Sequence, residues 1–157
     1  MSIMKMRDSV NETDSKFGAH GTVRFTVIDN NTIIFRARGP FNIELFRVLE
    51  KMELEVLKEI DKEAVSWVEA IIFEHSCLAT QELLSEFSKY LKFLRKNNLI
   101  PLVSAYVFKD EVEGAKLMPN EYKKCYDSAK MNFCSFDNEE KAIAHIRTYL
   151  PEEIKPA

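Results

Sequence analysis

The alternation of apolar and polar residues predicts a β-hairpin near the start of the chain. In residues 21–28 every second residue is apolar, which is the period of a strand with one buried face. Residues 32–38 repeat this alternation. Between the two runs, Asp29, Asn30 and Asn31 tolerate the left-handed backbone conformations of a tight turn. We therefore expect two antiparallel neighbouring strands.

The apolar run at residues 65–73 predicts the central strand of the fold. Its apolar side chains fall on both alternating faces, as a strand that is covered on both sides requires. The residues expected on one face are Val65, Trp67, Ile71 and Phe73, and those on the other face are Val68, Ala70 and Ile72. Two further β-rich runs, at residues 99–108 and 131–136, predict the last two strands.

Apolar residues recur at helical spacing between these strands. One stripe runs from Leu45 to Ile60, shortly after Asn42, which can cap a helix. A second stripe runs from Leu83 to Leu94 and joins two predicted strands, so a right-handed crossover should place this helix against the sheet between parallel strands. The first helix also carries acidic residues, which we expect to form a solvated face without a function: Glu44, Glu50, Glu53, Glu55 and Glu59.

The C-terminal third predicts two shorter helices. Gly114 and Pro119 interrupt the first of them, so it is expected only from Glu121 onward. Asp137 and Glu140 have the spacing of a capping box that opens the last helix. The predicted fold is an α/β domain with a mixed sheet of about five strands, which opens with an antiparallel hairpin and continues in βαβ units with four or five helices.

The chain length of 157 residues fits one domain with a sizeable core. Residues 1–20 show neither helical nor strand periodicity, so they are expected to form a flexible N-terminal tail. Residues 21–150 are expected to form the domain, and residues 151–157 a C-terminal tail. No stretch rich in proline, glycine or serine divides the body of the chain.

Charge and cysteine content narrow the range of partners. The formal net charge is -3 with both signs spread along the chain, so a nucleic-acid partner is not expected. No apolar run approaches the roughly 20 residues that span a bilayer, so no transmembrane segment is expected. Cys77, Cys125 and Cys134 form no CxxC pair and follow an N-terminus without an apolar signal core, which favours a reducing, cytoplasmic location. A homo-oligomer is compatible with the sequence.

Glu74, His75, Ser76 and Cys77 place an acid, a base and two nucleophiles side by side, an arrangement that invites a hydrolase hypothesis. However, no Gly-x-Ser-x-Gly elbow surrounds them. The three histidines lie far apart in the sequence, and the four glycines form no phosphate-binding loop. No catalytic residue, metal or cofactor is therefore expected.

Four segments carry a resemblance to a known family: GTVRFTVIDNNTIIFRARGPFN, AIIFE followed by LATQELL, LIPLVSAYVF, and FCSFDNEEKAIAHIRTYL. Their order resembles the STAS domain of anti-sigma factor antagonists and its SpoIIAA-like relatives. The resemblance covers about residues 21–150. It implies a STAS-like fold for this domain.

In regulatory members of that family, the turn before the second helix reads Asp-Ser-Ser-Gly, and a Ser or Thr there is phosphorylated to break a complex with a kinase. That motif falls on residues 79–82, where Thr80 keeps a hydroxyl. The resemblance therefore implies that Thr80 is a phosphoacceptor or a partner contact. We expect a non-enzymatic regulatory or protein-interaction module that binds a protein partner through the turn containing His75, Ser76 and Gln81.

Two alternatives to a protein-interaction module stay open. Other SpoIIAA-like proteins have been suggested to hold small apolar molecules, so this chain could be a carrier of a small apolar ligand or lipid. The helix residues that could wall such a cavity are Phe46, Met52, Phe87, Tyr90 and Phe93. The third alternative is an enzyme that uses His75 or Cys77.

Overall fold

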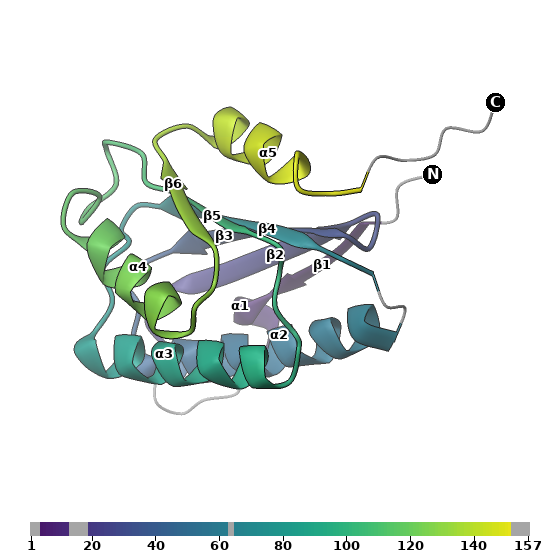
Figure 1. Ribbon diagram of the computed structural model, residues 1–157. Helices are drawn as coiled ribbons and strands as arrows, with labels where there is room; N and C mark the ends of the chain where they lie inside the picture. The colour runs from purple at the N-terminus through teal and green to yellow at the C-terminus, as the bar shows by residue number, and fades with distance from the viewer. Residues whose placement is uncertain (1–3, 13–18, 63–64, 152–157) are drawn as a thin grey trace.

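The computed structural model describes residues 4–12, 19–62 and 65–151 (Figure 1). Its centre is one six-stranded sheet in which the strands lie in sequence order. The strands are β1 (Met4–Asp8), β2 (Thr22–Ile28), β3 (Thr32–Arg38), β4 (Val68–Glu74), β5 (Ser104–Val107) and β6 (Phe133–Phe136). The helices are α1 (Ser9–Glu12), α2 (Ile43–Lys62), α3 (Gln81–Lys96), α4 (Met118–Ser128) and α5 (Glu139–Arg147).

The sheet is mixed, as the sequence predicts. Strands β1, β2 and β3 are antiparallel neighbours, whereas β3, β4, β5 and β6 are paired in parallel. In the turn between β2 and β3, Asp29 and Asn30 have left-handed φ angles of 51° and 58°, which matches the turn that favours a two-stranded hairpin. The α/β class, the opening hairpin and the parallel order that follows it are confirmed.

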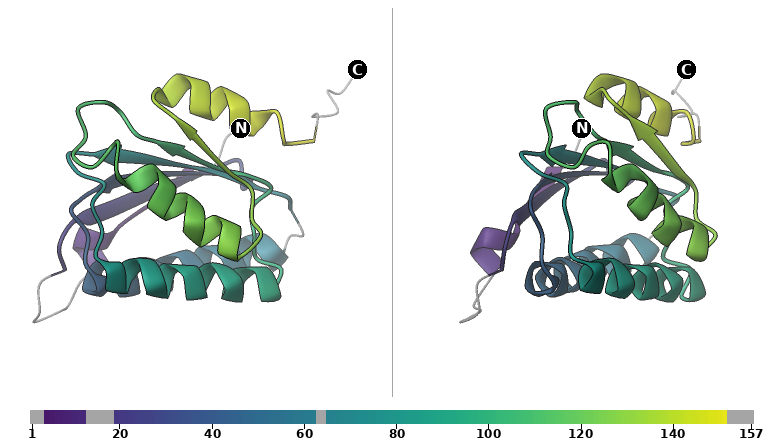
Figure 2. Two further views of the ribbon diagram at one scale, coloured as in Figure 1. Left: turned by 60° about the vertical axis from the view of Figure 1, so that its left-hand side comes forward. Right: turned by 90° about the vertical axis from the view of Figure 1, so that its left-hand side faces the viewer.

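Helices cover both faces of the sheet. Helices α2, α3 and α4 lie on one side, and α5 lies on the other (Figure 2). The two faces of β4 bury the residues that the alternation predicts: Trp67 and Phe73 belong to the larger apolar cluster, and Val68 and Ile72 belong to the smaller one, with Ile146 of α5. Strand β4 is therefore an interior strand that is covered on both sides.

Strand β1 is the main departure from the sequence prediction. A flexible tail is expected for residues 1–20, but residues 4–12 form β1 and α1, and β1 pairs with β2 along its whole length. The Arg7 Nη1 donates hydrogen bonds to the backbone oxygen of Met52 (3.2 Å) and to Glu55 Oε2 (2.9 Å) on α2. An edge strand gains backbone hydrogen bonds without any side-chain periodicity, so the pattern does not reveal it. Other parts of the predicted tails, residues 1–3, 13–18 and 152–157, lie outside the described residues.

Two helix starts differ from the prediction by a few residues. Helix α4 begins at Met118 instead of Glu121, because Pro119 occupies the first turn, where its missing N–H has no intrahelical partner to lose. Helix α5 is capped by the side chain of Asn138 instead of Asp137. Within the described part of the chain, no helix has the length and apolar character needed to cross a membrane.

Candidate functional site

The turn between β4 and α3 carries the residues that the sequence predicts to meet a partner. His75, Thr80 and Gln81 are exposed there. His75 has a left-handed φ of 65°, which is uncommon for a residue with a side chain. Thr80 is the N-cap of α3, because its Oγ1 accepts a hydrogen bond from the backbone N–H of Leu83 at 3.1 Å. The exposed part of this turn is thus a fixed structure at the end of β4.

Ser76 lies inside the protein, contrary to the prediction that it faces a partner. Its exposed fraction is 0%. The Ser76 Oγ donates a hydrogen bond to Glu113 Oε1 (2.9 Å) and accepts one from the backbone N–H of Leu78 (3.2 Å). Ser76 and Glu113 also form an isolated parallel β-bridge, so the loop before α4 lies beside the serine. The hydroxyl is used within the fold, so only His75, Thr80 and Gln81 remain as the exposed turn.

Cys77 is buried among apolar side chains, and its thiol donates a hydrogen bond to the backbone oxygen of Glu113 (Sγ to O, 3.3 Å). Burial raises the pKa of the Cys77 thiol to about 11. Because the thiolate is the nucleophilic form, this environment disfavours nucleophilic chemistry at Cys77. Among the described residues, no three His, Cys, Asp or Glu side chains are grouped so that they could hold a metal ion.

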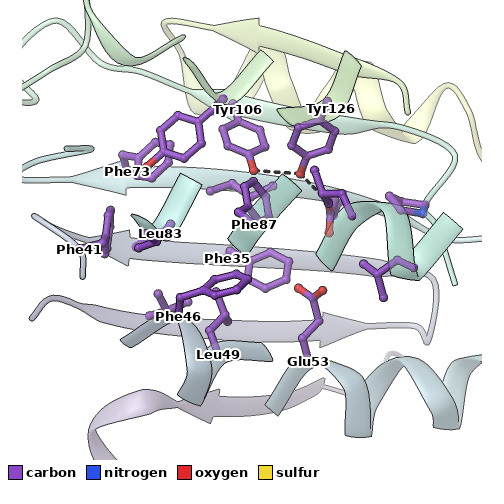
Figure 3. Close-up of a pocket in the computed structure, with 18 of the residues that line it drawn as sticks. Phe35, Phe41, Phe46, Leu49, Glu53, Phe73, Leu83, Phe87, Tyr106 and Tyr126 are labelled. Carbon is purple, nitrogen blue, oxygen red and sulfur yellow. Dashed lines mark hydrogen bonds between the residues drawn. The ribbon is translucent and has the colours of Figure 1, made fainter. Parts of the chain in front are cut away.

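A cavity of about 100 Å³ lies between the sheet and helices α2, α3 and α4 (Figure 3). Aromatic and aliphatic side chains form most of its wall. The rings that Figure 3 labels around it are Phe35, Phe41, Phe46, Phe73, Phe87, Tyr106 and Tyr126. The wall contains two acidic residues, Glu53 and Glu69, and the described residues that line it include no Lys, Arg or His.

Glu69 is the buried acid of the sheet. It lies on β4 with an exposed fraction of 6%. Its Oε1 accepts hydrogen bonds from Ser104 Oγ (2.6 Å) and Tyr126 Oη (3.4 Å), and the Tyr126 hydroxyl also pairs with the Tyr106 hydroxyl at 2.9 Å. Burial raises the pKa of the Glu69 carboxyl to about 8, and the negative charge of Glu53 acts in the same direction.

Glu53 reaches toward the cavity from α2 (Figure 3). The residue is half-buried, and its Oε1 accepts a hydrogen bond from Tyr90 Oη of α3 at 2.7 Å. Burial raises the pKa of the Glu53 carboxyl to about 7; the hydrogen bond from Tyr90 opposes this shift, and the charge of Glu50 adds to it. Both acids of the cavity are thus placed where the neutral form is favoured in the absence of a positive partner.

Each acid keeps one oxygen free. Within the described part of the chain, the hydrogen bonds to both carboxyl groups go to Oε1, and none goes to Oε2 of Glu53 or Glu69. Every fully enclosed side-chain oxygen of the described residues has a hydrogen-bond partner. The unpartnered Oε2 of Glu69 therefore retains accessible surface, and because Glu69 lines the cavity we place that surface at the cavity wall.

Neither acid is predicted from the sequence to line a cavity, although each leaves a signal there. Glu69 stands between Trp67 and Ile71 in the alternation of β4, so the strand period alone assigns it to the face of the larger core. Glu53 follows Leu49 by four residues, which is the spacing of the inward stripe of α2. The prediction that Glu53 is simply part of a solvated face is therefore wrong.

The fold and the cavity together define the class of this protein: an α/β protein with a mixed sheet and a largely apolar cavity that contains two acids. Comparisons of the chain with models of known protein families, with curated proteins and with solved structures found no match. The geometry of the cavity and of the exposed turn is therefore the basis for assigning a function.

Proposed function

We propose that this protein binds a small, mostly apolar molecule in the cavity between the sheet and helices α2, α3 and α4. The observation that supports this proposal is the cavity of about 100 Å³ among the side chains of the larger apolar cluster. Protein interiors contain few voids larger than a water molecule. A ligand that fills such apolar space gains dispersion contacts and removes apolar surface from water.

The wall of the cavity has the composition of a ligand pocket. Such pockets are lined mainly by apolar and aromatic side chains, with a small number of polar groups that orient the ligand. Here Glu53 and Glu69 are the polar groups, and Ser104, Tyr90 and Tyr126 hold them in place by hydrogen bonds. A cavity of about 150 Å³ lined by aliphatic and aromatic side chains can bind benzene, so this smaller cavity suits a molecule with fewer non-hydrogen atoms than benzene.

Two measurements test the proposal. Native mass spectrometry of the full chain, purified from its own cells, should show a retained small molecule. An NMR titration with 2-methylbutane should shift the amide signals of residues around the cavity. If the wild-type protein retains no molecule and also fails to bind 2-methylbutane, the cavity is only a packing defect and the proposal is wrong.

A pair of matched variants assigns the binding to the cavity. Leu49 lines the cavity and Leu54 does not, although both are half-buried residues of α2. Leu49→Phe should fill part of the void and weaken binding of 2-methylbutane, whereas Leu54→Phe should leave it unchanged. Equal binding by both variants would place the probe elsewhere on the molecule.

A second candidate function is a module that binds a protein partner through His75, Thr80 and Gln81. The observation that favours it is the backbone hydrogen bonding of the turn: the oxygen of His75 accepts from the N–H of Glu113 (3.0 Å), and the oxygen of Ser76 accepts from the N–H of Gly39 (2.9 Å). An exposed surface that is already ordered loses little entropy when it binds. Membership of the STAS or SpoIIAA-like family and a cytoplasmic, regulatory role remain predictions that would fit this candidate.

A further inference from the structure

We propose that the ligand of the cavity carries a basic nitrogen, which is held as a cation between Glu53 and Glu69. This inference rests on the proposed function, because it names the chemical class of the molecule that the cavity binds. Three features of the wall support it: two acids without a basic partner, free carboxyl oxygens, and aromatic rings.

The two acids reach the cavity from different layers of the fold. Glu69 belongs to β4 in the sheet, and Glu53 belongs to α2 in the helical layer. Among the described residues that line the cavity, these two are the only ionisable groups apart from tyrosines. A carboxylate in apolar surroundings is costly unless a positive group pairs with it. A cation between the layers would supply this missing partner for both acids.

The hydrogen-bonding capacity of the pair also fits an amine. Oε1 of each carboxyl accepts from the protein, and Oε2 of each has no partner among the described residues. A primary ammonium group has three N–H donors, which is enough for one donor to each free oxygen. Glu69 is more than nine-tenths buried, so in its ionised form the free oxygen needs a donor in the cavity.

Aromatic rings around the acids favour the same class of ligand. Phe35, Phe46 and Phe87 line the cavity together with Glu53 (Figure 3). The face of an aromatic ring attracts a cation, and the attraction is stronger where water is excluded. An apolar body with one ammonium group would therefore match the wall, with its carbon atoms against the rings and its nitrogen between the acids.

Binding of an ammonium group should depend on pH. Because both acids favour the neutral form in the empty cavity, entry of a cation requires a proton to leave. Affinity should rise from about pH 6 to about pH 8 as the two carboxyl groups ionise. Among the described residues, the other titratable groups that interact with the pair are Glu50 of α2, through its charge, Tyr90 of α3, Tyr106 of β5 and Tyr126 of α4.

Three probes of equal size separate the chemistry of the ligand from its shape: isobutylamine, isobutanol and 2-methylbutane. For the wild-type protein at about pH 8, isobutylamine should bind about tenfold or more tightly than either neutral probe, because charge-assisted hydrogen bonds are about twice as strong as neutral ones. Calorimetry in two buffers of different ionisation enthalpy should show proton release when the amine binds at about pH 6.

Variants of the acids assign this preference to the pair. Glu69→Gln and Glu53→Gln should each reduce the binding of isobutylamine to the level of 2-methylbutane. Binding of 2-methylbutane itself should persist, which also shows that each variant is folded. Glu50→Gln is the matched control, since Glu50 lies on α2 near Glu53 but does not line the cavity, and it should keep the preference for the amine.

The outcomes distinguish this inference from the proposed function. If 2-methylbutane binds and isobutylamine binds no more tightly, the inference is wrong and the proposed function stands. If isobutanol binds most tightly, or if the amine binds at about pH 6 without releasing a proton, the acids do not hold a cation and the inference is also wrong. If none of the three probes binds, the inference is wrong, and the proposed function also fails if the purified protein retains no molecule.

Discussion

Thr80 has a structural role that can be separated from a regulatory one. Its hydroxyl oxygen caps α3, yet the residue is exposed. Thr80→Ala should lower the free energy of unfolding by about 1 kcal/mol, because an N-cap hydrogen bond is lost. Thr80→Asp should have little effect, because aspartate also caps and suits the positive end of the helix dipole. Urea denaturation of the three proteins measures both effects.

The same variants test the exposed turn as a protein-binding surface. If charge at Thr80 controls a partner, Thr80→Asp should keep the fold and weaken the complex, because a negative charge in a packed interface is repelled or costly to desolvate. Pull-downs with wild type, Thr80→Ala and Thr80→Asp provide the comparison. Ser85→Asp adds a charge at another exposed position of α3 and serves as a control. Identical partners in identical amounts would exclude Thr80 as a switch.

The three cysteines should differ in their rates of labelling. Cys77 and Cys125 are buried, and Cys134 is half-buried. Burial raises the pKa of all three thiols, that of Cys77 to about 11. At neutral pH a mild electrophile should therefore modify Cys134 first and Cys77 very slowly, as mass spectrometry of peptides would show. Rapid labelling of Cys77 in the folded protein would revive the hypothesis of an enzyme that uses this residue.

Among the elements, β4 and β1 mark the two ends of the expected range of local stability. Strand β4 is paired on both sides and buried on both faces, whereas β1 is an edge strand with one neighbour. Amides of β4 should be among the slowest to exchange with solvent, and those of β1 should exchange much faster, because an edge strand can open without unfolding the sheet. Hydrogen exchange followed by NMR measures this order. Fast exchange throughout β4 would contradict the fold.

The elements also show what the sequence can predict. The hairpin β2–β3 and the buried strand β4 follow from apolar periodicity, because each must cover one or two faces of a core. Strand β1 has no such signal: it is held by backbone pairing to β2 and by Arg7, which contacts α2. The predicted start of α4 is too late because the first turn of a helix tolerates Pro119, although a proline inside a helical pattern indicates an interruption.

At the scale of the whole molecule, the acids of the cavity should make stability depend on pH. Folding raises the pKa of Glu53 to about 7 and that of Glu69 to about 8, from an ordinary value of 4.5. Between 4.5 and about 8 the folded state then binds more protons than the unfolded state. This contribution to stability is complete below pH 4.5 and is lost as the pH rises through 7 and 8.

Urea denaturation over this pH range provides the test. The urea concentration at the unfolding midpoint of the wild-type protein should decrease as the pH is raised to about 8. Glu69→Gln should make this decrease smaller, because the amide does not ionise. Glu111→Gln, at an exposed position before α4, should retain the wild-type slope. Glu139 acts in the opposite direction, since its hydrogen bond with Arg36 lowers the pKa of Glu139, but its effect is confined to the region below pH 4.5. A flat wild-type profile would mean that the acids are solvated in the folded protein.

The candidate site was harder to predict than the fold because it forms between distant segments. Glu53, Glu69, Ser104 and Tyr126 come from α2, β4, β5 and α4, and they meet only after the crossover connections are complete. Each acid alone fits an ordinary pattern, either a charged helix face or an interruption of an apolar strand. Only the folded structure shows that both acids line one cavity.

The carboxyl group of Glu69 in the core has a consequence for laboratory evolution. Moving a carboxyl group from water into apolar surroundings costs free energy, and a library selected only for survival of heating would favour its replacement by an apolar residue of similar volume. Positions 53 and 69 would then become apolar. The selected proteins would unfold at a higher temperature but would have lost the polar part of the cavity. A parallel selection that also rewards capture of an amine would retain both glutamates. The difference between the two selected populations would measure how much stability this protein gives up for recognition.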